Sequence, residues 1–248
     1  MREVFIKSSY DETEQPFLYY PAREENRPLL VGLHTWSFDR FNQVERLVPF
    51  AEKLDFNLIL PEFRGPNLET NPHCLEACGS PAAINDILDD IDYICKTEKI
   101  DTKNIFLLGA SGGGHMALMT AAARPELFAC VASFVPITDV KRWAKENENY
   151  APGIIACCGG DEREMEKRSP ISYTKQLAKA NLKIFCGKYD HIVPFKHSLD
   201  LYNEILKADE KARVYLDIFD GGHEMVLSKA EEWIMSQYKK QKSEIVTG

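Results

Sequence analysis

Ser111 stands between two glycines in the segment GASGG, residues 109–113, where an apolar run gives way to small residues. The pattern G-x-S-x-G is typical of a serine nucleophile on a sharp turn from a strand into a helix, and Gly109 and Gly113 provide the small residues that this turn requires. Such a turn exposes the hydroxyl and points the first N–H groups of the helix at a developing oxyanion. A glycine-rich phosphate-binding turn is the alternative, but the segment lacks the lysine of a P-loop and the spacing of a dinucleotide fingerprint.

A serine hydroxyl needs a general base to act as a nucleophile, and the base needs a carboxylate to orient it. Asp190 follows the apolar segment KIFCGKY, and His223 follows another apolar segment and two glycines. Ser111, Asp190 and His223 occur in the chain order that these three roles have on one α/β architecture. Asp220 also ends an apolar segment and competes for the acid role. We favour Asp190 because the acid normally follows the penultimate strand.

The elements that must position these residues alternate between strand-like and helix-like segments. Strands are predicted over residues 2–9, 16–21, 27–35, 56–63, 104–111, 128–136, 182–190 and 212–220, and helices over 42–54, 80–100, 112–124, 172–180, 195–208 and 224–241. The first two strands flank a polar turn and are expected to form an antiparallel hairpin at one edge. Continuous apolar runs in the later strands are typical of parallel strands that are buried on both faces.

We therefore predict a single α/β domain over residues 1–248, with about eight mostly parallel strands flanked by helices on both faces. Residues 138–170 carry no clear periodicity and are expected to be an irregular, cap-like insertion above the carboxyl ends of the strands. Ligands bind at that edge of open α/β sheets. Ser111, Asp190 and His223 are expected to meet there.

Composition excludes several classes of partner. The net charge is −8 and no cluster of Lys and Arg forms a basic face, so we expect neither a nucleic-acid nor a membrane partner. The N-terminus lacks the apolar region of a signal peptide, and no stretch approaches the roughly 20 apolar residues of a membrane span. Seven cysteines are an odd number, several lie inside apolar runs, and Cys74 and Cys78 have no second pair at metal-ligand spacing. We expect a reduced, cytoplasmic protein without a metal or organic cofactor.

These motifs resemble the prolyl oligopeptidase-like branch of the α/β-hydrolases, over essentially its catalytic domain. The resemblance rests on G-x-S-x-G-G-x-x-A at Gly109, Ser111, Gly113, Gly114 and Ala117, on G-x-x-D-x-x-V-P at Gly187, Asp190, Val193 and Pro194, on RSP at Arg168 to Pro170, and on R-G at Arg64 and Gly65. It implies the α/β-hydrolase fold and the same three catalytic residues that the strand ends had indicated.

The resemblance also implies an oxyanion hole. One donor is the backbone N–H of Gly112, and the other belongs to the loop LHTWSFD, where it falls on the backbone N–H of Trp36. This sequence has Thr35 where a glycine is usual, which leaves the geometry of that loop to be determined.

For several other residues, the sequence is compatible with both a substrate-binding role and a structural role. Trp143 and Tyr150 either line a substrate pocket or form the core of the insertion. Glu62 and Arg64 follow a strand end and either bind a polar substrate or form a structural ion pair, which we favour. His34 and His115 are expected to be structural.

The expected chemistry is acyl transfer to water through an acyl-enzyme. We favour a small-molecule ester as the substrate, such as a short-chain ester of a sugar or another small alcohol. The reason is that about 30 residues before the third strand leave no room for the N-terminal propeller that peptidases of this branch carry. A serine exopeptidase or oligopeptidase is the first alternative, and a non-catalytic binding protein on the same fold is the second.

Overall fold

The computed structural model describes residues 1–247, with side chains over residues 1–239. The strands are β1 (Arg2–Lys7), β2 (Glu14–Tyr20), β3 (Arg27–Leu33), β4 (Asn57–Pro61), β5 (Ile100–Ala110), β6 (Cys130–Phe134), β7 (Leu182–Gly187) and β8 (Val214–Phe219). The helices are α1 (Val44–Leu54), α2 (Pro81–Thr97), α3 (Gly112–Ala123), α4 (Val140–Glu146), α5 (Ala151–Cys157), α6 (Glu162–Lys167), α7 (Thr174–Leu177), α8 (Lys196–Ala208) and α9 (Leu227–Thr247), with short 3₁₀ turns η1 (Cys74–Glu76) and η2 (Pro170–Tyr173).

The strands form one sheet in the order β1-β2-β4-β3-β5-β6-β7-β8. β2 runs antiparallel to both of its neighbours, and β3 to β8 are parallel. Val4 pairs with Phe17 in the β1–β2 hairpin, as the polar turn between them predicted. The α/β-hydrolase fold predicted from the sequence is confirmed.

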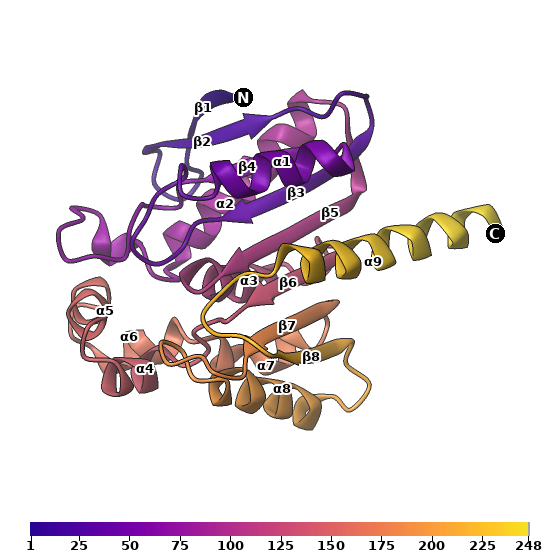
Figure 1. Ribbon diagram of the computed structural model, residues 1–248. Coiled ribbons are helices and arrows are strands. Elements are labelled where there is room, and N and C mark those ends of the chain that lie inside the picture. The colour runs from indigo at the N-terminus through magenta and orange to yellow at the C-terminus, as the bar shows by residue number, and fades with distance from the viewer. Residues whose placement is uncertain (248) are drawn as a thin grey trace.

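Both faces of the sheet are covered by helices, because successive residues of a strand point to opposite faces. Leu29 and Val31 of β3 are fully buried in a core that also contains residues of α2, α3, α7 and α8. Leu30, between them, is fully buried in a second core with residues of α1 and α9. Figure 1 shows α1 and α9 on the same face of the sheet. This double burial explains why the parallel strands have continuous apolar runs rather than alternating ones.

Helix α2 shows how the local sequence sets an element boundary. The hydroxyl of Ser80 accepts a hydrogen bond from the backbone N–H of Ala83 at 3.1 Å, and Pro81 occupies the first helical position. Ile87, Ile91 and Ile94 are fully buried. The cap and the proline explain why the helix begins at Pro81, one residue into the predicted range.

The insertion between β6 and α7 differs from the prediction. Residues 138–170 are not irregular, because they form the short helices α4, α5 and α6, which lie beyond the carboxyl ends of the parallel strands (Figure 1). Asp139 and Asp161 cap α4 and α6 through hydrogen bonds to backbone N–H groups. Helices of six or seven residues are marginal alone, and here a separate apolar core that contains Trp143 stabilises them. So short a helix shows no complete apolar repeat in the sequence.

No helix within residues 1–247 combines the length and the apolar character needed to cross a membrane. No group of three or more His, Cys, Asp or Glu side chains within residues 1–239 is arranged to hold a metal ion.

Candidate active site

Ser111 occupies the turn between β5 and α3 in a strained backbone conformation. Its φ is 56° and its ψ is −120°, a combination that residues other than glycine rarely adopt. The turn is held by the backbone, since the N–H of Ser111 donates to the carbonyl of Phe134 at 2.9 Å. A Cβ atom at Gly109 would overlap the carbonyl group of Gly113, so the two glycines allow the strand and the helix to meet this closely. This is the sharp strand-to-helix turn that the motif predicted.

Gly112 brings the start of α3 against the loop after β3. A Cβ atom at Gly112 would lie 2.5 Å from the backbone nitrogen of Trp36 and 2.6 Å from its Cα atom, so these two backbones are in direct contact. The N–H of Gly112 has no acceptor within its helix, because it is the first helical residue. The N–H of Trp36 makes no hydrogen bond to any residue that the structure describes. Two adjacent backbone donors are thus available for an anion.

The structure accommodates Thr35 in place of the usual glycine. The φ of Thr35 is not positive, so the backbone conformation at this position does not require a glycine. Its backbone N–H and its hydroxyl both donate to Oδ1 of Asn42, at 3.1 and 3.2 Å. On the other side, the N–H of Asn67 donates to the carbonyl of Trp36 at 2.8 Å. Neither asparagine was predicted from the sequence, although the Asn42 contact is of a common kind, in which a side-chain oxygen soon after a loop accepts unpaired backbone N–H groups.

Asp190 and His223 form a hydrogen-bonded pair at the ends of β7 and β8. Nδ1 of His223 lies 2.7 Å from Oδ2 of Asp190. The other carboxylate oxygen accepts the backbone N–H groups of Ile192 and Val193, at 2.8 and 2.9 Å. Asp220, the competing acid, is exposed. The structure therefore joins His223 to Asp190.

Backbone contacts hold the two loops of this pair together. The N–H groups of Lys188 and Tyr189 donate to the carbonyls of Phe219 and Gly221, each at 2.9 Å. These bonds continue the parallel pairing of β7 with β8 beyond the last paired residues of the strands. The relative position of Asp190 and His223 is therefore fixed by the sheet itself.

Ser111 lies at the carboxyl end of β5 and is half-buried. Its hydroxyl makes no hydrogen bond to His223 or to any other side chain within residues 1–239. The structure thus brings Asp190 and His223 into direct contact and places Ser111 at the same edge of the sheet. Hydrogen bonds between catalytic groups are often long in the absence of a substrate and shorten when one binds.

A model of the prolyl oligopeptidase family matches residues 81–242, which is more than half of the chain. The chain belongs to the prolyl oligopeptidase family. The matched region includes Ser111, Asp190 and His223.

Three relatives of this chain are much longer than it. The acylamino-acid-releasing enzyme of Mus musculus is 24% identical over 207 residues, covering 76% of this chain and 28% of that enzyme. The inactive dipeptidyl peptidase 10 of Mus musculus is 29% identical over 118 residues, covering 48% of this chain and 14% of that protein. A short match joins 50 residues to the acetyl esterase Axe7A of Xylanibacter ruminicola at 40% identity, covering 20% of this chain and 11% of that esterase. The chain thus spans less than a third of the length of these relatives.

Among solved structures, the acylaminoacyl peptidase of Pyrococcus horikoshii superposes with a TM-score of 0.72. The alignment covers 90% of this chain and 37% of the peptidase, at 22% sequence identity. At that identity the likeness demonstrates the shared fold.

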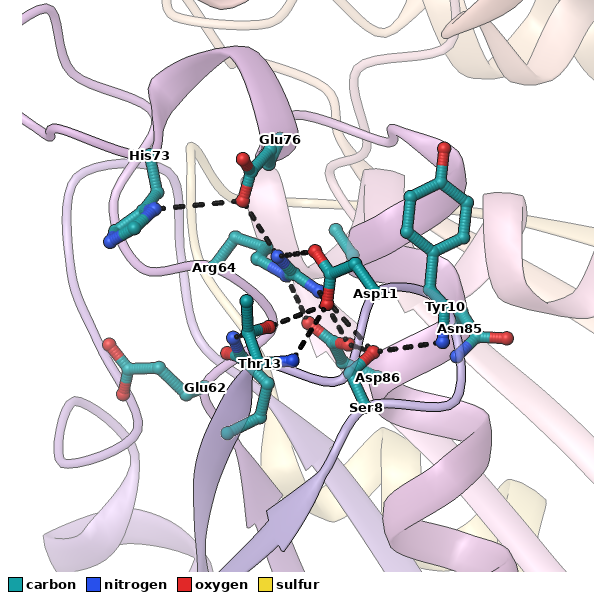
Figure 2. A network of polar contacts seen from close by, with 12 residues as sticks. Ser8, Tyr10, Asp11, Thr13, Glu62, Arg64, His73, Glu76, Asn85 and Asp86 are labelled. Carbon is teal, nitrogen blue, oxygen red and sulfur yellow. Dashed lines mark hydrogen bonds and ion pairs between the residues drawn. The ribbon is translucent and has the colours of Figure 1, made fainter.

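The R-G motif of the prolyl oligopeptidase family lies in a buried ionic network in this chain (Figure 2). The Arg64 guanidinium contacts Asp86 at 2.6 Å, Asp11 at 2.8 Å and Glu76 at 2.6 Å. The hydrogen bond from Arg64 holds the pKa of the Asp11 carboxyl well below its ordinary value. Glu62 instead pairs with Arg40 at 2.6 Å. Both residues of the predicted ion pair have structural partners, but not each other.

The aromatic residues of the insertion differ in burial. Trp143 is fully buried, whereas Tyr150 is half-buried and stacks on it with ring centroids 4.6 Å apart. The side chain of Trp36 meets the Trp143 ring edge-on, at 4.9 Å. Trp143 therefore belongs to the core of the insertion, and Tyr150 keeps an exposed surface.

The two histidines expected to be structural are buried. The imidazole of His34 stacks on Phe63 at 3.8 Å and lies 2.9 Å from the carbonyls of Thr35 and Glu62. Nε2 of His115 lies 2.7 Å from the carbonyl of Arg168, and burial lowers the pKa of His115 to about 4. His34 thus supports the loop after β3, and His115 ties α3 to the insertion.

Proposed function

We propose that this chain is a serine hydrolase that cleaves an acyl compound through a covalent acyl-enzyme. Ser111 is the nucleophile, His223 the general base and Asp190 the acid that orients the imidazole. The observation that carries the proposal is the strained Ser111 turn at the sheet edge that also holds the Asp190–His223 pair. A serine without function in that turn would retain the cost of strain, of order 1–3 kcal/mol, for no gain.

In the first half of the reaction, the hydroxyl oxygen of Ser111 attacks the carbonyl carbon of the substrate and its proton passes to Nε2 of His223. The negative charge that develops on the carbonyl oxygen is stabilised by the backbone N–H groups of Trp36 and Gly112. His223 then gives the proton to the leaving group, which departs and leaves an ester on Ser111.

In the second half, His223 takes a proton from water, and the resulting hydroxide attacks the acyl-enzyme. Collapse of the second tetrahedral intermediate returns the proton to Ser111 and releases the acid. Throughout, the carboxylate of Asp190 holds the Nδ1–H of His223, so that Nε2 is the atom that exchanges protons.

For the bond that is cleaved, we propose an amide of an N-acylated amino acid as the first candidate. Two relatives support it, since the acylamino-acid-releasing enzyme and the acylaminoacyl peptidase are named for such compounds. The preference for an ester that the sequence suggested has support in the short match to the acetyl esterase. A short acyl ester is therefore the second candidate.

The experiment compares p-nitrophenyl acetate and butyrate with N-acetylalanyl and unblocked alanyl p-nitroanilides. We expect turnover that Ser111→Ala abolishes and that Ser9→Ala, in the exposed hairpin turn, leaves unchanged. Preference for the acetylated anilide supports the first candidate, and preference for the esters supports the second. If the protein hydrolyses none of them and a fluorophosphonate fails to label Ser111, the proposal of a hydrolase is wrong and a binding role is favoured.

A further inference from the structure

Helix α4 of the insertion contacts the loop that carries Asp190. The indole N–H of Trp143 donates to the backbone carbonyl of Ile192 at 2.8 Å. The side-chain amide of Asn147, one turn further along, donates to the same oxygen at 3.2 Å. Trp143 is fully buried, so this bond is shielded from water. The carbonyl of Ile192 therefore receives two donors from the insertion.

This carbonyl belongs to the same peptide group as an N–H that binds Asp190. The Ile192 carbonyl and the Val193 N–H are the two ends of one planar unit. The Val193 N–H donates to Oδ1 of Asp190 at 2.9 Å, and Oδ2 accepts from His223 at 2.7 Å. Donors on the carbonyl fix the plane of the peptide group and polarise it, which strengthens the bond that its N–H donates. A continuous chain of hydrogen bonds thus runs from α4 to the imidazole.

Helix α4 is itself anchored to α8. Arg142 pairs with Asp200 of α8 at 2.8 Å, and Glu146 lies 2.9 Å from Nε2 of the buried His197. These contacts hold the helix through side chains that make no hydrogen bond to Ile192 or Asp190. They provide a matched control for general loosening of the insertion.

We propose that Trp143, assisted by Asn147, is a positioning residue for the acid–base pair. It holds the peptide group between Ile192 and Val193 so that Asp190 keeps the imidazole of His223 in register with Ser111. The same indole makes an edge-to-face contact with the Trp36 ring, and the Trp36 backbone lies against Gly112. The buried side chain of Trp143 therefore contacts both the loop that carries Asp190 and the loop after β3 that contains Trp36. This proposal rests on the proposed function of Ser111, Asp190 and His223.

The test uses Trp143→Phe, which keeps a ring but removes the donor, and Asn147→Ala, which removes the second donor from a half-buried position. We expect each to lower kcat roughly 3- to 10-fold and the double variant more, because small displacements of a catalytic group have effects of this order or larger. KM should stay within about twofold, whereas a residue that lines the substrate pocket would change KM. Arg142→Met, which loosens α4 without touching Ile192, should lower the thermal midpoint and leave kcat unchanged.

A second readout does not depend on turnover. The Nδ1 proton of His223, in a short bond to a carboxylate, should give a far-downfield proton NMR signal, assigned by its loss in His223→Gln. We expect the signal to shift or broaden in Trp143→Phe and Asn147→Ala but not in Arg142→Met. An unchanged signal and kcat in Asn147→Ala and in folded Trp143→Phe would overturn the proposal. If Trp143→Phe does not fold, Asn147→Ala decides it alone.

The two proposals fail differently. If fluorophosphonate does not label Ser111 of the unmodified protein, the hydrolase proposal fails, and the NMR signal still tests the link from α4 to His223. If labelling is normal and the variants match the unmodified protein in kcat and in the signal, only the positioning role fails.

Discussion

Nδ1 of His223 lies 2.7 Å from Oδ2 of Asp190, and the Asp190 side chain is fully buried. Its other oxygen is held by the N–H groups of Ile192 and Val193. The carboxylate is thus fixed on both sides, and the imidazole can present only its Nε2 atom to Ser111. This arrangement separates the orienting group from the proton-transferring atom.

Replacing Asp190 by Asn should therefore abolish most turnover while the fold persists. An amide has nearly the shape of the carboxylate but favours the wrong imidazole tautomer, which in serine hydrolases lowers kcat by about 10⁴. Steady-state kinetics on whichever substrate proves active measure the effect. Asp220→Asn, at the exposed competing position, is the control and should retain full kcat. Equal losses in the two variants would contradict the assignment of Asp190.

Gly112→Ala should impair the oxyanion hole. The new Cβ atom would lie 2.5 Å from the backbone nitrogen of Trp36, so the two donors must move apart. Removing one oxyanion donor lowers kcat by about 10²- to 10³-fold, and we expect a loss of that order with little change in KM. Gly222→Ala, where no heavy atom lies within 4 Å of the added Cβ, should be tolerated. Normal kcat in Gly112→Ala would mean that the loop can retreat without cost to the reaction.

The fold and the acid–base pair could be predicted from the sequence because their signals are local. An apolar run, a glycine turn and a polar residue at a strand end are each visible within about ten residues of chain. The parallel arrangement of the later strands then follows from their continuous apolar runs. The antiparallel hairpin, the helix that starts near Ser80 and the pairing of His223 with a strand-end carboxylate all arise in this way.

The contacts that support the site could not be predicted, because they join distant segments through single atoms. Trp143 and Ile192, which are 49 residues apart, meet through one carbonyl oxygen. No hydrophobic periodicity in the sequence indicates which two residues make such a contact. The same holds for Arg64, whose carboxylate partners come from three separate segments of the chain.

Replacing Arg64 by Met should strongly destabilise the protein. The Arg64 side chain is buried among Asp11, Glu76 and Asp86 (Figure 2). Removing the guanidinium leaves the buried Asp86 carboxylate uncompensated, at a cost of about 3–5 kcal/mol. Urea unfolding at pH 7 measures the loss. Lys99→Met, which breaks the exposed pair with Glu25, should cost no more than about 0.5 kcal/mol. Similar losses in the two variants would show that burial does not determine how much the Arg64 ion pairs contribute to the free energy of unfolding.

His115 should make the protein less stable as the pH falls from about 6.5 to about 4. Burial lowers the pKa of His115 from 6.5 to about 4, so the folded state keeps a neutral imidazole while the unfolded chain takes up a proton. Stability is therefore complete above about pH 6.5, declines through that interval and levels off below it, by about 3 kcal/mol in all.

His115→Gln tests this dependence, since the Gln amide can still donate to the carbonyl of Arg168. Urea unfolding at several values between pH 7 and pH 4 should give a shallower decline in this variant than in the unmodified protein. His34 and His197, whose pKa values burial also lowers, should maintain part of the slope. His191→Gln, on the exposed loop after Asp190, is the matched control. If His115→Gln keeps the full decline, protonation of His115 is not what destabilises the fold in mild acid.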